Sequence, residues 1–287
     1  RLKFYCKKNK VEIVQPHSSS YFTAFLLKLI YPKIQIIWHD HNGLSEFLGS
    51  QKWIPLKVAS FFFKGIVVVN DRLKKWAEKE LFCKNVIYLP NFTNKENNIH
   101  KETILKGESG KRIICLANLR YQKNHFLLLK LAEKLKKSHS DWSFHLVGKD
   151  FQDDYSVRLK QLIKNKKLVH TVYLYGTKND ITHILSQSEI AILTSKSEGL
   201  PVALLEYGLN RKPVVVTKVG EMPMIIENGV NGYLVESGDV TEFYESLKKL
   251  IEDADRNRFG ENLYHKIKKD YGEDGVLYTY LQWTKTL

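Results

Sequence analysis

The stretch Thr194-Ser195-Lys196-Ser197-Glu198-Gly199-Leu200-Pro201 joins two apolar segments with different patterns. Residues 190–193 form a short apolar run, as expected of a strand buried in a parallel sheet. Residues 202–209 are apolar except for one carboxylate, Glu206, and predict a helix. Parallel α/β sheets bind ligands where a strand ends and its helix begins. The stretch therefore predicts an α/β fold with a binding site in this loop.

The start of that helix favours phosphate oxygens. Gly199 permits close approach of a ligand to the backbone, and Pro201 suits the first helical position, so we expect the helix to begin there. The open N–H groups at its start, and the helix dipole, which is equivalent to about +0.5 charge at the N-terminus, would attract a diphosphate. Glu206 lies further along the helix, within reach of ribose hydroxyls, while Glu198 would face a sugar. Either glutamate alone is explained as a solvated charge, but a carboxylate inside an apolar stretch needs a partner.

Short apolar runs alternate with helical patterns along the chain. The runs lie at residues 11–14, 34–38, 66–69, 86–89, 113–117, 144–147, 172–175, 190–194, 213–217 and 233–235. Between two of them, Leu128, Leu131 and Leu135 recur at helical spacing. This alternation predicts parallel sheets. The polar stretch 91–111 separates two groups of runs and predicts a domain boundary.

The composition favours anionic partners. Lys and Arg number 45 against 31 Asp and Glu, a net charge of +14, which suits nucleotides, lipid surfaces or nucleic acid. The three scattered cysteines indicate neither a disulfide framework nor a zinc site. No apolar run approaches the ~20 residues that span a bilayer, and the start lacks a signal-peptide pattern. We expect a cytoplasmic protein and, lacking any nucleic-acid-binding motif, no nucleic-acid partner.

Residues 195–208, continued by residues 211–215 and Gly220, resemble the signature of glycosyltransferase family 4. That family has two glutamates separated by seven residues, which Glu198 and Glu206 match. The resemblance implies that Glu198 contacts the donor sugar and Glu206 the nucleotide ribose. It also implies the GT-B fold, an α/β architecture of two Rossmann-like domains whose parallel sheets face a cleft.

Further motifs of that family occur in its order, at residues 118–124, 147–148, 175–176 and 228–233. The resemblance implies that Lys123 contacts the donor phosphates. Asn118 stands close to where many members carry a phosphate-binding arginine, and Arg120 is expected to substitute for it. The expected donor-binding residues are Asn118, Arg120, Lys123, Gly176, Glu198, Gly199, Leu200, Pro201 and Glu206.

Histidines follow two strands of the first half. His17 comes after residues 11–15 and His41 after residues 34–38, at the carboxyl ends where parallel sheets bind ligands. The resemblance implies that His17 lies near the acceptor or donor sugar. We expect His17 and Glu198 to be the catalytic residues. A structural role for His17 is the alternative, and His39 and His41 are lesser candidates.

The resemblance divides the chain into four parts. These are an acceptor-side domain at residues 1–95, a linker at 96–111, a nucleotide-sugar-binding domain at 112–268, and a C-terminal helix at 269–287 that packs back on the first domain. The family begins with a strand and glycine-rich loop that have no counterpart here. We therefore expect an incomplete N-terminal domain, which leaves the activity of the chain open.

The implied function is that of a retaining glycosyltransferase of hexosyltransferase type. It would move a sugar from a nucleotide diphosphate sugar, with a UDP-sugar favoured, to a glycan or lipid-linked acceptor in cell-surface polysaccharide synthesis. No metal or other cofactor is expected, since Lys123 and the helix start would carry the leaving group's charge. The basic chain suits the anionic inner face of the plasma membrane. The alternatives are a sugar-nucleotide epimerase on the same fold and a non-catalytic basic protein that binds glycan or nucleic acid.

Overall fold

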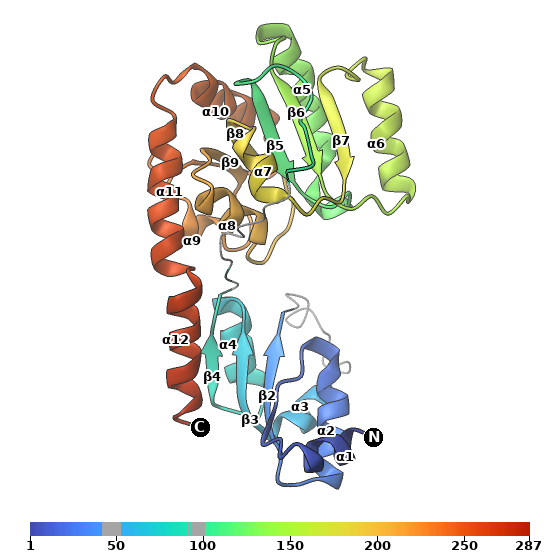
Figure 1. The fold of residues 1–287 in the computed structure, drawn as a ribbon, viewed down its shortest axis with the longest axis vertical. Helices are drawn as coiled ribbons and strands as arrows, with labels where there is room; N and C mark the ends of the chain where they lie inside the picture. The colour runs from blue at the N-terminus through green and yellow to red at the C-terminus, as the bar shows by residue number, and fades with distance from the viewer. Residues whose placement is uncertain (42–52, 91, 93–100) are drawn as a thin grey trace. The chain divides into compact units, whose positions relative to one another are not determined.

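The computed structural model describes residues 1–41, 53–90, 92 and 101–287. The chain divides into two compact units (Figure 1), one made of Arg1–Asn91 with Asp274–Leu287 and the other of Phe92–Glu273. Each unit holds one parallel sheet flanked by helices. Every predicted apolar run overlaps a strand. The predicted α/β class with two parallel sheets is confirmed.

The sheet of the first unit has the order β1-β2-β3-β4. Its strands are β1 (Ile13–Val14), β2 (Gln35–Asp40), β3 (Phe63–Val68) and β4 (Val86–Tyr88), and its helices are α1 (Leu2–Lys8), α2 (Tyr21–Ile30), α3 (Ile54–Ser60), α4 (Asp71–Glu80) and α12 (Glu273–Thr284). One face of the sheet is buried by α2, α3 and α4, around Trp38, Ile66 and Leu73. Strand alternation turns Ile37 and His39 to the opposite face.

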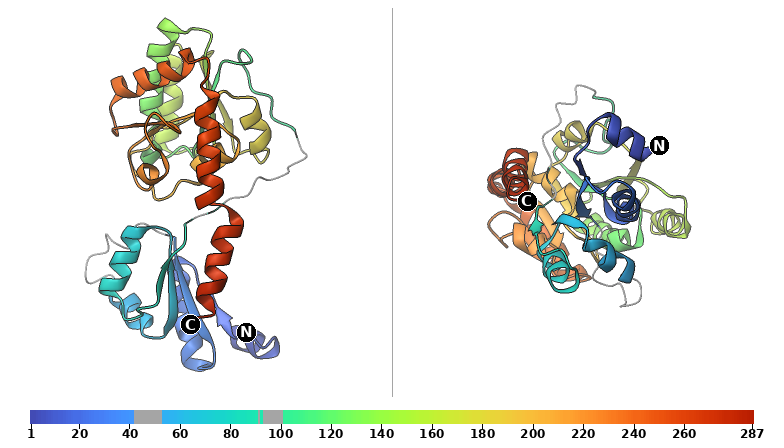
Figure 2. Two further views of the ribbon diagram at one scale, coloured as in Figure 1. Left: turned by 90° about the vertical axis from the view of Figure 1, so that its left-hand side faces the viewer. Right: turned by 90° about the horizontal axis from the view of Figure 1, so that it is seen from below.

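Helix α12 covers that opposite face and lies beside the sheet in both side views (Figures 1 and 2). Val276 and Trp283 pack with Ile37 and Val67 of the strands. Gly65 makes this approach possible, because a β-carbon there would lie 2.5 Å from the Trp283 ring. Residues 274–287 therefore form part of the same compact unit as residues 1–91.

The sheet of the second unit has the order β10-β9-β8-β5-β6-β7, with every pair parallel. Its strands are β5 (Arg112–Leu116), β6 (Ser143–Val147), β7 (Val172–Gly176), β8 (Ile190–Leu193), β9 (Val214–Thr217) and β10 (Tyr233–Val235). Its helices are α5 (His125–Ser138), α6 (Asp154–Asn165), α7 (Ile181–Ser186), α8 (Val202–Leu209), α9 (Met222–Ile225), α10 (Val240–Glu252) and α11 (Asn257–Asp270). Strand β5 lies inside the sheet, between β8 and β6.

Both faces of this sheet are buried, which explains the apolar runs without polar alternation. Ile113 and Cys115 of β5 face a core shared with α5, α6 and α10. Their neighbours Ile114 and Leu116 face the other core, shared with α7, α8, α9 and α11. The second unit therefore has three layers, with the sheet between two layers of helices. The candidate site lies in the loops at the carboxyl ends of the strands.

The described part of the predicted linker belongs to the second unit. Thr103 donates from its backbone N–H (2.7 Å) and its hydroxyl (2.9 Å) to the carboxylate of Asp180. Leu105 is buried, and its N–H donates to the side chain of Gln187. Residues 101–111, which the sequence predicted to lie in the linker, are thus hydrogen-bonded to the second unit. Among the described residues, no helix is both long and apolar enough to span a membrane.

Candidate functional site

The loops that follow β5 and β8 lie next to each other, because these two strands pair in parallel. After β5 the chain forms a short 3-10 turn at Tyr121–Lys123 and enters α5. After β8 it passes through residues 194–201 and enters α8. The two sequence motifs with the strongest resemblance to the donor site therefore meet at the carboxyl edge of one sheet.

Lys123 and Glu198 form an ion pair at the meeting point. Lys123 Nζ lies 2.5 Å from one carboxylate oxygen of Glu198 and 2.8 Å from the other, and the Ser195 hydroxyl donates to the first of these at 2.5 Å. The Lys123 and Glu198 side chains are only 21% and 9% exposed. The sequence predicted both residues in the site, but not their pairing. Lys123 and Glu198 are 75 residues apart in the chain. No local sequence pattern therefore indicates that they form a pair.

Backbone contacts hold the two loops together. The Thr194 hydroxyl donates to the carbonyl oxygen of Lys123 at 3.0 Å, and the Lys196 N–H donates to the carbonyl of Gln122 at 2.7 Å. On the far side, the Thr217 hydroxyl donates to the Ser195 carbonyl at 2.7 Å. The ion pair therefore rests on backbone that is fixed from both sides.

Helix α8 begins one residue later than predicted. Pro201 is its N-cap, with an extended ψ of 118°, and Val202 is the first helical residue. The prediction that the helix starts at Pro201 is wrong by that residue, because the extended ψ keeps Pro201 outside the helix. No side chain caps α8. The Leu204 N–H donates to the Pro201 carbonyl at 3.0 Å, and the N–H groups ahead of it, at Val202 and Ala203, are the ones that a ligand in the loop could use.

Gly220 supports the same loop from the next strand. It has a φ of +57°, and a β-carbon there would lie 2.3 Å from the carbonyl oxygen of Glu198 and 2.4 Å from that of Gly199. The N–H of Glu221 donates to the Gly199 carbonyl at 3.0 Å. The loop around Glu198 and Gly199 thus packs directly on backbone that only glycine permits. The sequence pattern contained Gly220, but the reason for a glycine there was not predictable from it.

The other expected donor residues are spread over the same edge. Asn118 accepts the Lys149 N–H at 2.7 Å, joining the loops after β5 and β6. The Arg120 guanidinium lies 4.4 Å above the Phe151 ring. Glu206 is half-buried within α8.

Two further expected donor residues have ordinary structural surroundings. Leu200 is buried in the core between α8 and the sheet. Gly176 ends β7 with a φ of +68°. A positive φ of this size explains the glycine without reference to a ligand.

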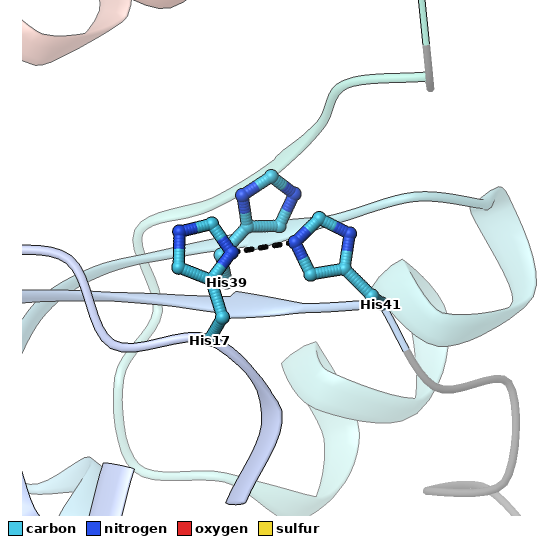
Figure 3. Close-up of side chains that lie close together, drawn as sticks. All are labelled: His17, His39 and His41. Carbon is cyan, nitrogen blue, oxygen red and sulfur yellow. Dashed lines mark hydrogen bonds between the residues drawn. The ribbon is translucent and has the colours of Figure 1, made fainter. Parts of the chain in front are cut away.

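Three histidines gather at the carboxyl edge of the first sheet (Figure 3). His17 pairs in register with His39 across neighbouring strands, and His41 follows two residues later on the same face. His17 Nδ1 lies 2.6 Å from His41 Nε2. Burial, and then the neighbouring His41 and His17, lower the pKa of His39 to about 3. Burial, and then His17, also lower the pKa of His41.

The sequence named all three histidines but predicted no cluster. The spacing His39-Asp40-His41 on a strand was the available signal, because alternate residues share a face. His17 belongs to the first unit and Glu198 to the second, so each expected catalytic residue is described within its own sheet.

Solved glycosyltransferases share this architecture. The whole chain superimposes on 81% of Anabaena Alr3699/HepE, solved with UDP and glucose, with a TM-score of 0.83 and 18% identity. It superimposes over 98% of its length on 57% of Staphylococcus aureus TarM, with a TM-score of 0.78 and 18% identity. The two parallel sheets and their connections are those of a GT-B glycosyltransferase.

The family follows from the sequence match. Residues 94–266 match the pattern of the glycosyl transferases group 1, and the chain belongs to that family. An Escherichia coli UDP-Gal:alpha-D-GlcNAc-diphosphoundecaprenol alpha-1,3-galactosyltransferase is 24% identical over 91% of this chain and 72% of its own length. A Staphylococcus aureus poly(ribitol-phosphate) alpha-N-acetylglucosaminyltransferase is 23% identical over 88% of this chain but only 50% of its own length.

Proposed function

We propose that the protein transfers a sugar from a nucleoside diphosphate sugar to a hydroxyl of a glycan or lipid-linked acceptor, with retention of configuration. The observation that carries this is the Lys123–Glu198 pair beside the uncapped start of α8. A cation and free N–H groups offer two sets of donors to a diphosphate. A UDP-sugar is the favoured donor, since the superimposed HepE structure contains UDP and glucose.

In this proposal each residue of the site has a role that suits its position at the sheet edge. Lys123 and the α8 N–H groups stabilise the charge that develops on the leaving diphosphate. Glu206 accepts hydrogen bonds from the ribose, and Glu198 orients the donor sugar while it fixes Lys123. Asn118, Arg120 and Gly176 complete the donor-binding residues at the same edge. His17 acts near the sugar that is transferred.

Phosphate charge in this proposal is carried by the protein, and no metal takes part in the transfer. The chain has one Asp-x-Asp sequence, Asp253-Ala254-Asp255, which lies just after α10. Both carboxylates contact Arg258 there, at 2.9 and 3.5 Å. These aspartates serve to close a surface turn and stand apart from the strand ends that hold the site.

The acceptor belongs to polysaccharide or lipid-linked glycan synthesis at the cytoplasmic membrane face. The E. coli and S. aureus relatives are named for acceptors of these kinds. Exposed apolar side chains of α2, Phe22, Leu26 and Leu29, lie in a chain of net charge +14. That combination suits an anionic lipid surface, and co-sedimentation with anionic but not neutral vesicles tests it.

The substitution Lys123→Ala tests the donor site. We expect the transfer rate to fall by about 100- to 1000-fold, as for other lost transition-state donors, and UDP to bind more weakly. Lys137→Ala is the matched control, since Lys137 is exposed at the far end of α5. Calorimetry with UDP and a radiolabelled-sugar transfer assay provide the two readouts.

Unchanged UDP affinity and transfer in Lys123→Ala would refute the proposed donor site. Product analysis in the absence of acceptor distinguishes a glycosyltransferase from the alternative sugar-nucleotide epimerase. The epimerase would isomerise the free donor. Salt-sensitive oligonucleotide binding without UDP binding would instead indicate a non-catalytic basic protein.

A further inference from the structure

The three histidines at the edge of the first sheet form a compact set of metal-binding atoms. One ring nitrogen of each of His17, His39 and His41 lies within 4.8 Å of the others. Figure 3 shows the three rings lying close together, with a nitrogen of His17 facing one of His41, and the His39 ring is stacked on the His41 ring with centroids 3.9 Å apart. Among the described residues, no other group of three His, Cys, Asp or Glu side chains comes together this closely.

We propose that His17, His39 and His41 bind a divalent transition-metal ion, with Zn²⁺ the best fit. Imidazole nitrogen is a preferred ligand of this ion, and three protein ligands with one open position is a common arrangement for it. His17 and His41 are exposed, so the fourth position is accessible to water.

Metal binding requires ring rotations together with small changes in distance, because the His39 and His41 rings are stacked with centroids 3.9 Å apart. Zn–N bonds of about 2.0–2.1 Å in a tetrahedral site place ligand nitrogens about 3.3 Å apart. The widest pair is at most 4.8 Å apart, so it would close by about 1.5 Å. The pair His17 Nδ1 and His41 Nε2, now 2.6 Å apart, would open slightly as the ion replaces their shared proton. Both rings are at the surface and free to make these rotations.

Gln15 can supply the outer contact that a metal-binding histidine needs once its amide is turned over. Its Nδ1 lies 3.2 Å from the Gln15 amide, and the Tyr280 hydroxyl donates to Gln15 Oε1 at 2.8 Å. A half-turn of the Gln15 amide exchanges its oxygen and nitrogen without moving either neighbour. Its oxygen then accepts from His39 Nδ1–H, and the Tyr280 oxygen accepts from its nitrogen. This contact fixes the tautomer that leaves Nε2 free to bind metal.

His39 Nε2 also lacks any other partner. It is buried and has no hydrogen bond within the described part of the chain. A buried ring nitrogen without a partner is costly. A cation bound at His39 Nε2 removes this cost, because it takes the lone pair of that nitrogen.

The test is a Zn²⁺ titration of the full chain, prepared without a histidine tag and without nucleotide. We expect one equivalent to bind, in competition with a chromophoric chelator. Co²⁺ in its place should give the intense visible absorption of a tetrahedral site. His17→Ala and His41→Ala should each abolish the site, and Gln15→Ala should weaken it by about 10- to 100-fold. His265→Ala removes an exposed histidine of the second unit and is the matched control.

Equal Zn²⁺ affinity in wild type, His17→Ala and His41→Ala would overturn the proposal, as would an equal loss in His265→Ala. Thermal melting of each variant separates a lost site from a lost fold. His17→Ala and His41→Ala change exposed side chains and leave the half-buried His39 intact, so folding should be retained. Metal binding is measured without nucleotide, so this proposal and the donor-site proposal fail independently.

Discussion

A single ion pair, between Lys123 and Glu198, lies at the centre of the proposed donor site. Lysine has a flexible stem, and ordering it costs up to about 2 kcal/mol of side-chain entropy. In this protein Glu198 holds Lys123 in place, and the Ser195 hydroxyl in turn donates to Glu198. The pair is largely buried, so removing one partner leaves an uncompensated charge. Glu198→Gln is therefore a gentler change than Glu198→Ala for separating positioning from folding.

The substitution Glu206→Ala tests a second single residue, the one proposed to bind the ribose. A hydrogen bond to a charged group contributes about 1.5–3 kcal/mol, so UDP affinity should fall by roughly 10- to 150-fold. The free energy of unfolding should change much less. Glu245→Ala is the control, because Glu245 is an exposed glutamate on α10. Calorimetry with UDP decides the matter, and equal affinities in the two variants would exclude the ribose role.

At the scale of elements, the loop after β8 depends on the strand beside it. Gly220→Ala should destabilise the second unit and weaken UDP binding, since its β-carbon would meet two carbonyl oxygens. Gly229 also has a positive φ, +81°, but has open space around it. Gly229→Ala should therefore cost only the left-handed strain, about 1–2 kcal/mol.

Urea unfolding and UDP titration of the two glycine variants provide the comparison. The Gly220→Ala variant should lose about 1–3 kcal/mol more than Gly229→Ala, the usual penalty of overpacking. If the two variants were equally destabilised and both kept their UDP affinity, the loop at residues 194–201 would not depend on contact with Gly220.

The sequence predicted elements better than their contacts. The strands were predictable because both faces of each sheet are buried, and α8 was correct apart from its start at Pro201. The pairing of Lys123 with Glu198 was not predictable, since it depends on β5 and β8 becoming neighbours across 75 residues. The histidine cluster likewise needed the register of His17 with His39. Local patterns specify elements, whereas these contacts come from strand order.

At the scale of the whole molecule, two buried histidines make the second unit acid-sensitive. Burial, and then Arg112, lower the pKa of His145 to about 3, and burial lowers that of His125 to about 4. Both are neutral when folded, while the unfolded chain takes up protons near pH 6.5. Stability is therefore present above about pH 6.5 and falls as pH drops toward 4.

The expected slope for unfolding of the second unit is about 3 kcal/mol per pH unit in that window, shared equally by the two histidines. Urea unfolding at several pH values measures it. His145→Gln should remove about half of the slope, whereas His265→Gln, at an exposed position, should leave it unchanged. A flat profile between pH 6.5 and 4 in the wild type would contradict the prediction.

The first unit is built from two ends of the chain, with the whole second unit between them. On the ribosome, residues 92–273 emerge and can fold before the helix that packs against Ile37 and Val67 has been made. Until then the nascent first sheet has one apolar face without its cover. Its maturation must wait for translation of residues 274–287, and a premature stop codon that removes them would harm residues 1–91, which are synthesised earlier.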